Sequence, residues 1–269
     1  MSTKHILITG GHSGIGLELT KMLLKETYIR LGLVMRSEKR KASIPQELLD
    51  APNIEFFYSD LSDQNSVQKL AEELSSAWPK LDVLFNNAGV LLDKFYESKQ
   101  GNEMHLEVNT LAPYKLSHSL LPLLEKAEEA VIVNTVTDGL NRKKFLKLEA
   151  FDKEKPFSKL FGAYLESKFA LTLLSQELLP LSPKIRIMNV TPGPNKTPMT
   201  AASGMPAWLL PLRNLFFPKP TKGAGLLYKG AFDPVHKNHP YAYISGNKKA
   251  NLRYKLSESE KESLLSKLS

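Results

Sequence analysis

The sequence of 269 residues contains no cysteine. This absence excludes disulfide bonds, thiolate zinc sites, iron–sulfur clusters and cysteine nucleophiles, and it is compatible with a reducing compartment. A long apolar run is also lacking near the start, where residues 6–8 are too few for a signal peptide or a membrane span. We therefore expect a cytoplasmic protein with no membrane span and no metal site.

The 15 glycines and 17 prolines are too few and too irregularly spaced for a collagen-like or low-complexity chain. With 42% apolar residues the chain can bury a core, so long disordered stretches are also excluded. We find no linker or internal repeat. The length fits one large α/β domain over residues 1–269.

Acidic residues are fewer than basic ones, which gives a formal net charge of +8. The basic residues lie in separate short clusters at 36–41, 142–147 and 248–255, with no aromatic-interleaved stripe between them. Clusters of this kind are usually solvated faces. We therefore expect no nucleic-acid partner, although a basic nucleic-acid binder is the reading that net charge alone would favour.

Apolar runs rich in β-branched residues alternate with amphipathic stretches along the chain. We predict strands at 4–9, 29–35, 54–58, 81–86, 131–135, 184–190 and 241–244, and helices at 14–26, 38–49, about 63–77, around 101–124, 163–179 and near 221–231. A capping box, Ser257-x-x-Glu260, opens a terminal helix. Strands that are apolar throughout are buried on both faces, which predicts a parallel sheet covered by helices on each side.

A glycine-rich turn, Gly10-Gly11-His12-Ser13-Gly14-Ile15-Gly16, follows the first predicted strand and opens directly into a helix. Such a turn lets backbone N–H groups approach a pyrophosphate at the helix N-terminus. A tight turn without a ligand would have the same local sequence. The other motifs of the chain must decide between the two readings.

Four further motifs stand at the ends of predicted elements: Asn86-Asn87-Ala88-Gly89, Asn109, Tyr164-x-x-x-Lys168 and Pro192-Gly193. In this order and spacing the chain resembles the classical short-chain dehydrogenase/reductase family over nearly its whole length. In motif detail it is most similar to retinol-dehydrogenase-like and WW-domain-oxidoreductase-like members. The resemblance implies a Rossmann-type, doubly wound parallel sheet with a C-terminal substrate lid, at about 195–222.

The resemblance also implies a nicotinamide cofactor. The second predicted strand ends in Met35-Arg36 rather than in an acidic residue, so Arg36 could bind a 2′-phosphate and NADP(H) is favoured. Asp60 matches the family's adenine contact, but it could equally begin the next helix. The cofactor-binding residues implied by the family motifs are Gly10, Ser13, Gly14, Ile15, Gly16, Arg36, Asp60, Leu61, Asn87, Ala88, Gly89, Tyr164, Lys168, Pro192, Gly193 and Thr197.

Tyr164 and Lys168 are four residues apart and so share one helix face. By resemblance Tyr164 transfers the proton, Lys168 lowers its pKa and holds the nicotinamide ribose, and Asn109 supports the relay. The family's serine aligns with Thr137, whose hydroxyl can still donate to a substrate oxygen. Thr135 is the second candidate for that role.

Two segments could shape the substrate site. The insertion at 141–158 either walls one side of the cleft or is a surface excursion. The lid is strongly apolar and could cover an apolar substrate, dip into a membrane or simply pack against the protein; its apolar residues are Met199, Met205, Trp208, Leu209, Leu210, Leu215, Phe216 and Phe217.

These observations predict an NADPH-dependent carbonyl reductase or alcohol dehydrogenase acting on a small carbonyl or alcohol substrate of apolar, retinoid- or steroid-like character. The alternative is an interaction protein that senses NADP(H) without turnover, because Thr137 replaces the family's serine and fold alone does not fix function. A homodimer through the helix at 163–179 is compatible with the sequence, unless the insertion covers that surface.

Overall fold

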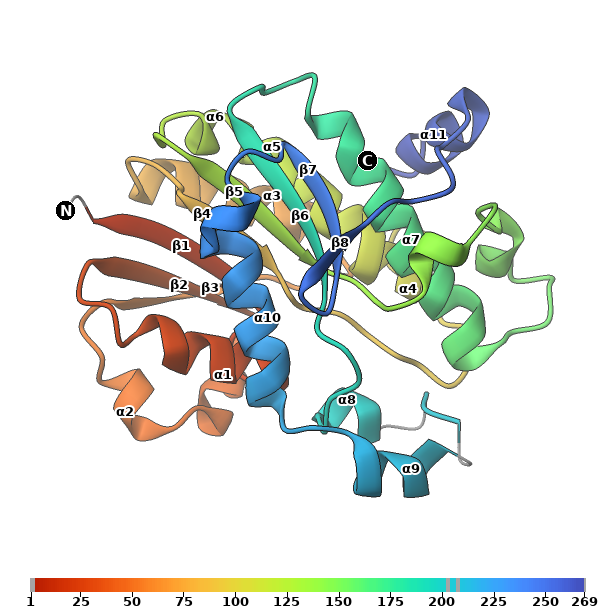
Figure 1. The fold of residues 1–269 in the computed structure, drawn as a ribbon, viewed down its shortest axis with the longest axis horizontal. Helices are drawn as coiled ribbons and strands as arrows, with labels where there is room; N and C mark the ends of the chain where they lie inside the picture. Colours follow the sequence, from red (N-terminus) through yellow and green to blue (C-terminus); the bar gives the residue numbers. More distant parts are fainter. Residues whose placement is uncertain (1–2, 202–203, 207–208, 269) are drawn as a thin grey trace.

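The computed structural model describes residues 3–201, 204–206 and 209–268, and within them eight strands form one sheet (Figure 1). The strands are β1 (Lys4–Thr9), β2 (Ile29–Met35), β3 (Ile54–Tyr58), β4 (Val83–Asn86), β5 (Ala130–Thr135), β6 (Ile185–Thr191), β7 (Tyr241–Ser245) and β8 (Lys248–Ala250). Their order is β3-β2-β1-β4-β5-β6-β7-β8, and only β7 and β8 pair antiparallel. The predicted doubly wound α/β fold is confirmed.

Helices connect the strands and cover both faces of the sheet. They are α1 (Gly14–Leu23), α2 (Gln46–Leu49), α3 (Gln64–Ala77), α4 (Met104–Leu106), α5 (Ala112–Ser119), α6 (Leu121–Leu124), α7 (Leu165–Leu174), α8 (Pro198–Ala201), α9 (Leu209–Phe216), α10 (Pro220–Phe232) and α11 (Glu258–Leu265). Shorter helical turns of 3₁₀ or π type are η1 (Glu38–Ser43), η2 (Glu107–Leu111), η3 (Leu140–Arg142), η4 (Leu148–Phe151), η5 (Lys159–Tyr164), η6 (Ser175–Leu178) and η7 (Pro234–His236).

Two apolar cores lie on opposite faces of the sheet, as the unbroken apolar strands require. In β1, Leu7 packs into the core that includes residues of α3, α5 and α7. Its neighbours Ile6 and Ile8 pack into the other core, with residues of α1 and α10. Figure 1 shows α1 and α10 side by side on that face. Both faces of the central strands are therefore shielded from water.

The strand order reverses at β1, which pairs with β2 on one side and β4 on the other. The chain leaves β1 toward one half of the sheet and returns through β4 in the other half. A crevice opens at such a switch point, outside the carboxyl ends of the strands, and ligands of open α/β sheets bind there. The glycine-rich turn and the Asn87–Gly89 segment follow these two strands directly.

A row of asparagines crosses the middle of the sheet. Asn86 of β4 donates from Nδ2 to Oδ1 of Asn134 in β5 over 2.9 Å, and Asn134 donates to Oδ1 of Asn189 in β6 over 3.0 Å. The three residues are direct register partners. Each is buried, so these bonds pair amide groups that water cannot reach, although Oδ1 of Asn86 has no partner among the described residues.

Some predicted elements differ from the structure. The helix expected at 38–49 is divided into η1 and α2, because Ile44 precedes Pro45 and adopts an extended conformation. The helix expected around 101–124 starts only at Met104 and widens into η2 just before Pro113, which has no N–H to donate. The short strand β8 was not predicted. The capping box of α11 is present as predicted, with Ser257 and Glu260 bonding each other's backbone.

Candidate active site

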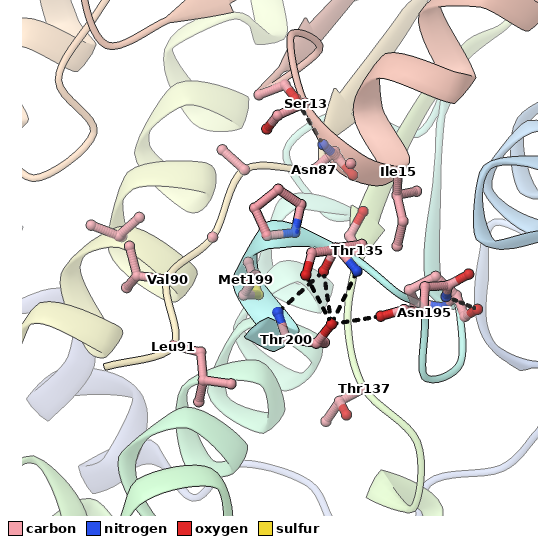
Figure 2. Close-up of a pocket in the computed structure, with 18 of the residues that line it drawn as sticks. Ser13, Ile15, Asn87, Val90, Leu91, Thr135, Thr137, Asn195, Met199 and Thr200 are labelled. Carbon is pink, nitrogen blue, oxygen red and sulfur yellow. Dashed lines mark hydrogen bonds between the residues drawn. The ribbon is translucent and has the colours of Figure 1, made fainter. Parts of the chain in front are cut away.

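A cavity of about 740 Å³ lies at the carboxyl ends of the central strands, where the switch point predicts a ligand site. Figure 2 shows Val90 and Leu91 on one side of it and Asn195 and Thr137 on the other. Its lining brings together most of the residues singled out in the sequence: Gly10, Ser13, Gly14, Ile15, Arg36, Leu61, Asn87, Ala88, Gly89, Thr137, Tyr164, Lys168, Pro192, Gly193 and Thr197. Gly16, Asp60 and Asn109 do not belong to this lining.

The glycine-rich turn forms the floor of the cavity beneath the start of α1. Ser13 caps α1 without a side-chain hydrogen bond, which leaves first-turn N–H groups for another acceptor. A methyl group at Gly16 would lie 2.3 Å from the Gly10 carbonyl oxygen, so only glycine allows this approach. An open anion cradle at a helix N-terminus fits the phosphates of a dinucleotide.

The turn after β4 is fixed to the turn after β1 by hydrogen bonds. The hydroxyl of Thr9 accepts from the backbone N–H groups of both Asn87 and Ala88 over 3.0 Å. Asn87 donates back from Nδ2 to the Thr9 carbonyl over 3.1 Å. These hydrogen bonds hold the two sides of the crevice together.

Two residues one helical turn apart hold the next stretch of the lining, residues 90–92. Asn109 accepts from the N–H of Val90 over 2.8 Å and donates to its carbonyl over 3.0 Å. His105 accepts at Nε2 from the N–H of Leu92 over 2.9 Å. Its Nδ1 lies 2.7 Å from Oε1 of the buried Glu103, which fixes the proton on Nδ1. Asn109 thus acts on the cavity through the backbone rather than by direct contact.

Tyr164, the last residue of η5, and Lys168, in the first turn of α7, both line the cavity. The Lys168 ammonium donates to the carbonyl of Thr135 over 2.8 Å. Burial raises the pKa of Tyr164 to about 12 and lowers the pKa of Lys168 to about 8. The ring of Tyr164 meets His105 edge-on, with 6.3 Å between ring centroids. At neutral pH the tyrosine therefore carries its proton and the lysine is mostly charged. The lowering of the Tyr164 pKa by Lys168 that the family resemblance implies is not found in this structure, where burial raises that pKa.

A small residue is required between these groups. A methyl group at Gly89 would lie 2.9 Å from Oδ1 of Asn109 and 3.2 Å from Nζ of Lys168. Glycine therefore allows the β4 turn to pass beside the ammonium and the amide at once.

Both candidate threonines at the end of β5 line the cavity. Tyr243 of β7 donates its hydroxyl to the carbonyl of Thr137 over 3.0 Å, which holds the backbone there. Among the described residues the Thr135 hydroxyl is buried without a hydrogen-bond partner. A buried unpaired hydroxyl that faces a cavity fits a ligand atom as its partner. The structure thus leaves both threonines as candidates.

A basic group lies at the end of the cavity near β2. Arg36 is exposed and its Nε is 3.7 Å from Oδ1 of Asp60. Arg40 and His12 also line this end. Sequence reasoning grouped Arg40 with its basic neighbours and so missed it. Its spacing of four from Arg36 was the available signal.

Asp60 faces this basic group without lining the cavity. It accepts from the N–H and hydroxyl of Ser62 and does not cap a helix. The cap of α3 is Asp63. The alternative reading of Asp60 as a helix-start residue is therefore wrong.

Hydrogen bonds of two side chains, Asn195 and Arg213, hold the first part of the lid. The buried Asn195, which sequence reasoning missed as an anchor, donates to the carbonyls of Pro192 and Gly193 and accepts from the N–H of Gly223 in α10. Arg213 of α9 donates to the Thr197 carbonyl over 3.2 Å. Met199, Met205 and Phe217 give the lid an apolar inner surface. Trp208 and the side chain of Leu209 lie outside the described residues.

The insertion at 141–158 does not wall the cavity: all of it is described, and none of it belongs to the lining. Instead it packs on α7. Lys143 pairs with the buried Glu166 over 2.6 Å, and the other carboxylate oxygen of Glu166 accepts from the N–H of Lys147. Phe157 stacks on His105, so the insertion contacts a residue that holds the cavity lining without reaching the cavity itself. The interpretation as a cleft wall is wrong.

Replacing Lys143 by Met should destabilise the protein by about 3 kcal/mol, because removing one partner leaves an uncompensated charge on buried Glu166. Lys144→Met is the matched control, since that side chain is exposed and should matter by less than about 0.5 kcal/mol. Urea unfolding of both variants measures the difference. Equal losses in the two variants would show that the buried pair does not hold the insertion.

Within the described ranges, no helix has the length and apolar character needed to cross a membrane. The same residues contain no group of three or more His, Asp or Glu side chains arranged to hold a metal ion.

Comparisons with known proteins agree with this geometry. Residues 4–144 match the family model described as short chain dehydrogenase. The chain is 40% identical over 146 residues to "Uncharacterized oxidoreductase DltE" of Bacillus subtilis, covering 52% of this chain and 55% of that protein. It is 32% identical over 250 residues to retinol dehydrogenase 14 of Mus musculus, covering 83% and 72%.

Among solved structures, the Pseudomonas aeruginosa RhlG/NADP active-site complex superposes with a TM-score of 0.69 at 23% identity, covering 91% of this chain and 95% of that chain. At this identity the likeness concerns the fold alone. The alignment with DltE spans little more than half of that protein's length.

Proposed function

Because this chain belongs to the short-chain dehydrogenase family, we propose that it is an NADP(H)-dependent oxidoreductase that interconverts an apolar carbonyl compound and its alcohol. The observation that carries the proposal is the meeting of Tyr164, Lys168 and a threonine hydroxyl in one cavity with an open glycine-rich turn. Polar groups suited to proton transfer and a cradle suited to a dinucleotide occur at the same switch point.

In the proposed reaction, the nicotinamide of the cofactor supplies or accepts the hydride at its C4. Tyr164 donates its proton to the substrate oxygen as negative charge develops there. The hydroxyl of Thr137 donates a hydrogen bond to the same oxygen.

Two other residues support the proton donor. Charged Lys168, held by the Thr135 carbonyl, favours the phenolate that Tyr164 leaves behind. Asn109 fixes the Val90 backbone, so the cavity wall next to the reacting atoms does not shift.

An apolar substrate is favoured by the lining beyond these polar groups, which is made by Leu91, Leu92, Leu160, Met199, Met205 and Phe217. Relatives that are named retinol dehydrogenases support the same class of alcohol or aldehyde. An NADPH-oxidation screen over aldehydes, ketones, quinones and retinoid- or steroid-like carbonyls tests the proposal. Turnover of any of them would exclude a cofactor sensor, whereas tight NADPH binding with no turnover of any carbonyl would favour the sensor.

NADPH should bind more tightly than NADH, because Arg36 and Arg40 place positive charge where the 2′-phosphate would lie. Charge-assisted hydrogen bonds contribute about 1.5–3 kcal/mol, which corresponds to roughly tenfold to a hundredfold in affinity. Arg36→Asp should therefore reverse the preference in a fluorescence titration of both cofactors.

Lys39→Asp is the matched control for this titration. It makes the same change of charge three residues away, at an exposed side chain that does not line the cavity. Equal affinities for the two cofactors in the parent protein, or equal shifts in the two variants, would contradict the role of Arg36.

A further inference from the structure

The outer face of α9 carries apolar side chains that the protein leaves uncovered. Leu215 is 75% exposed and Phe216 is 72% exposed, and Leu210 on the same helix is also exposed. Figure 1 shows α9 at the lower edge of the molecule, away from the sheet. Isolated exposed apolar residues are common, but two large adjacent ones on one short helix form a surface suited to a partner.

This surface adjoins the cavity. Phe217, the residue after Phe216, lines the cavity together with Met205 of the same lid. Arg213 ties α9 to the carbonyl of Thr197, another residue of the lining. A partner that covers Leu215 and Phe216 would therefore contact residues that directly precede a residue of the cavity lining, Phe217.

Positive charge flanks the exposed apolar residues. Lys196, Lys219 and Lys222 are exposed, and the N–H of Lys196 bonds the Pro218 carbonyl, which brings it next to the end of α9. The sequence has no Asp or Glu between residues 178 and 232. From another element, Glu18 of α1 accepts a hydrogen bond from Thr221 over 3.1 Å and is the acidic neighbour of this region. The local balance remains positive.

We propose that α9 and these three lysines dock on the surface of an anionic lipid bilayer. Apolar side chains that enter the interface, together with flanking lysines, are the combination that binds such surfaces. A second copy of the chain fits less well as the occupant, because two lysine-flanked faces would repel each other. Docking would bring the cavity next to the bilayer, so an apolar carbonyl or alcohol dissolved in the lipid could enter the cavity directly. This role in substrate delivery rests on the proposed function, whereas docking itself does not.

The test is flotation of the full chain with two kinds of vesicle, one of phosphatidylcholine alone and one that also contains phosphatidylserine. The parent should bind the anionic vesicles, and more weakly as salt is raised, because the Debye length shortens. The double variant Leu215→Ser with Phe216→Ser should bind at least about tenfold more weakly, since each large side chain loses its apolar contact.

A matched control replaces two other exposed apolar residues, Val235 and Leu181, by Ser; their exposed fractions are 66% and 53%, and neither lies on α9. This variant should bind like the parent. Lys219→Gln and Lys222→Gln should each weaken binding to anionic vesicles by about fivefold, with little effect on neutral ones.

Three results would overturn the proposal: no binding of the parent to anionic vesicles, equal losses in the α9 variant and its control, or an α9 variant that changes only the oligomeric state in sedimentation. The flotation assay measures vesicle binding and does not depend on enzymatic turnover. A chain that binds vesicles but reduces no carbonyl would therefore refute the proposed function and leave the docking surface standing.

Discussion

Replacing Tyr164 by Phe is expected to lower kcat by about a hundredfold to ten-thousandfold, the range usually contributed by a positioned proton donor. The substitution removes only the hydroxyl, and the ring can keep its edge contact with His105. Cofactor affinity should change little, because the glycine-rich turn, Arg36 and the Pro192–Gly193 segment are untouched. Steady-state NADPH oxidation and a fluorescence titration measure the two quantities separately.

Two further variants serve as comparisons for Tyr164→Phe. Tyr114→Phe makes the same chemical change at another buried tyrosine that does not line the cavity, so it should leave kcat unchanged. Lys168→Ala should reduce both kcat and cofactor affinity, because its ammonium acts on the phenolate and faces the cavity. If the Phe variant kept more than about one-hundredth of the parent rate, Tyr164 would not be the general acid.

Thr137→Ala should lower kcat by about a hundredfold to a thousandfold, the loss seen when one donor to a developing oxyanion is removed. Thr137→Ser should keep most of the activity, because the donor remains. The loss of the methyl group could even raise the rate with bulky ketones. Steady-state NADPH oxidation with the best substrate of the screen measures all variants.

Thr135→Ala decides between the two threonines. Its hydroxyl is buried, faces the cavity and has no partner among the described residues, so it competes for the same role. The backbone carbonyl that holds Lys168 is kept in this variant. An inactive Thr135→Ala beside an active Thr137→Ala would assign the donor to Thr135. Parent-like rates in both would remove the hydroxyl from the mechanism and favour a cofactor sensor.

Sequence reasoning predicted the fold well where the pattern is local. Apolar strands and amphipathic helices alternate along the chain, so the parallel sheet and the helices on its two faces could be predicted. The boundaries failed where a single residue overrides a pattern, as Pro45 does in dividing the helix expected at 38–49. For the insertion at 141–158 the sequence left a cleft wall and a surface excursion open, because nothing local shows that Lys143 pairs with Glu166 of α7.

The site was predictable where residues belong to the family motifs, including Asn109, which acts through the Val90 backbone. It was missed at residues outside those motifs that hold the backbone of other segments. His105 and Asn195 are examples, since each holds a segment of the cavity by bonding its N–H or carbonyl groups. No side-chain pattern marks the segments they hold. Arg40 was missed for another reason: it lies in a basic cluster, where only its spacing of four from Arg36 distinguishes it from its neighbours.

The asparagine row through β4, β5 and β6 bears on how the chain finds its alignment during folding. Strands that are apolar on both faces carry little information about register, because a shift of one residue still buries apolar side chains. Such a shift would leave the amides of Asn86, Asn134 and Asn189 without their hydrogen bonds in an apolar interior. Each unpaired amide would lower the stability of the shifted sheet by about 1–3 kcal/mol.

The shift would also displace Thr135 by about 3.3 Å against Gly89 and turn it to the other side of the sheet. Three buried amides, none of which lines the cavity, therefore help to set where the polar groups at the ends of β4, β5 and β6 lie in the cavity.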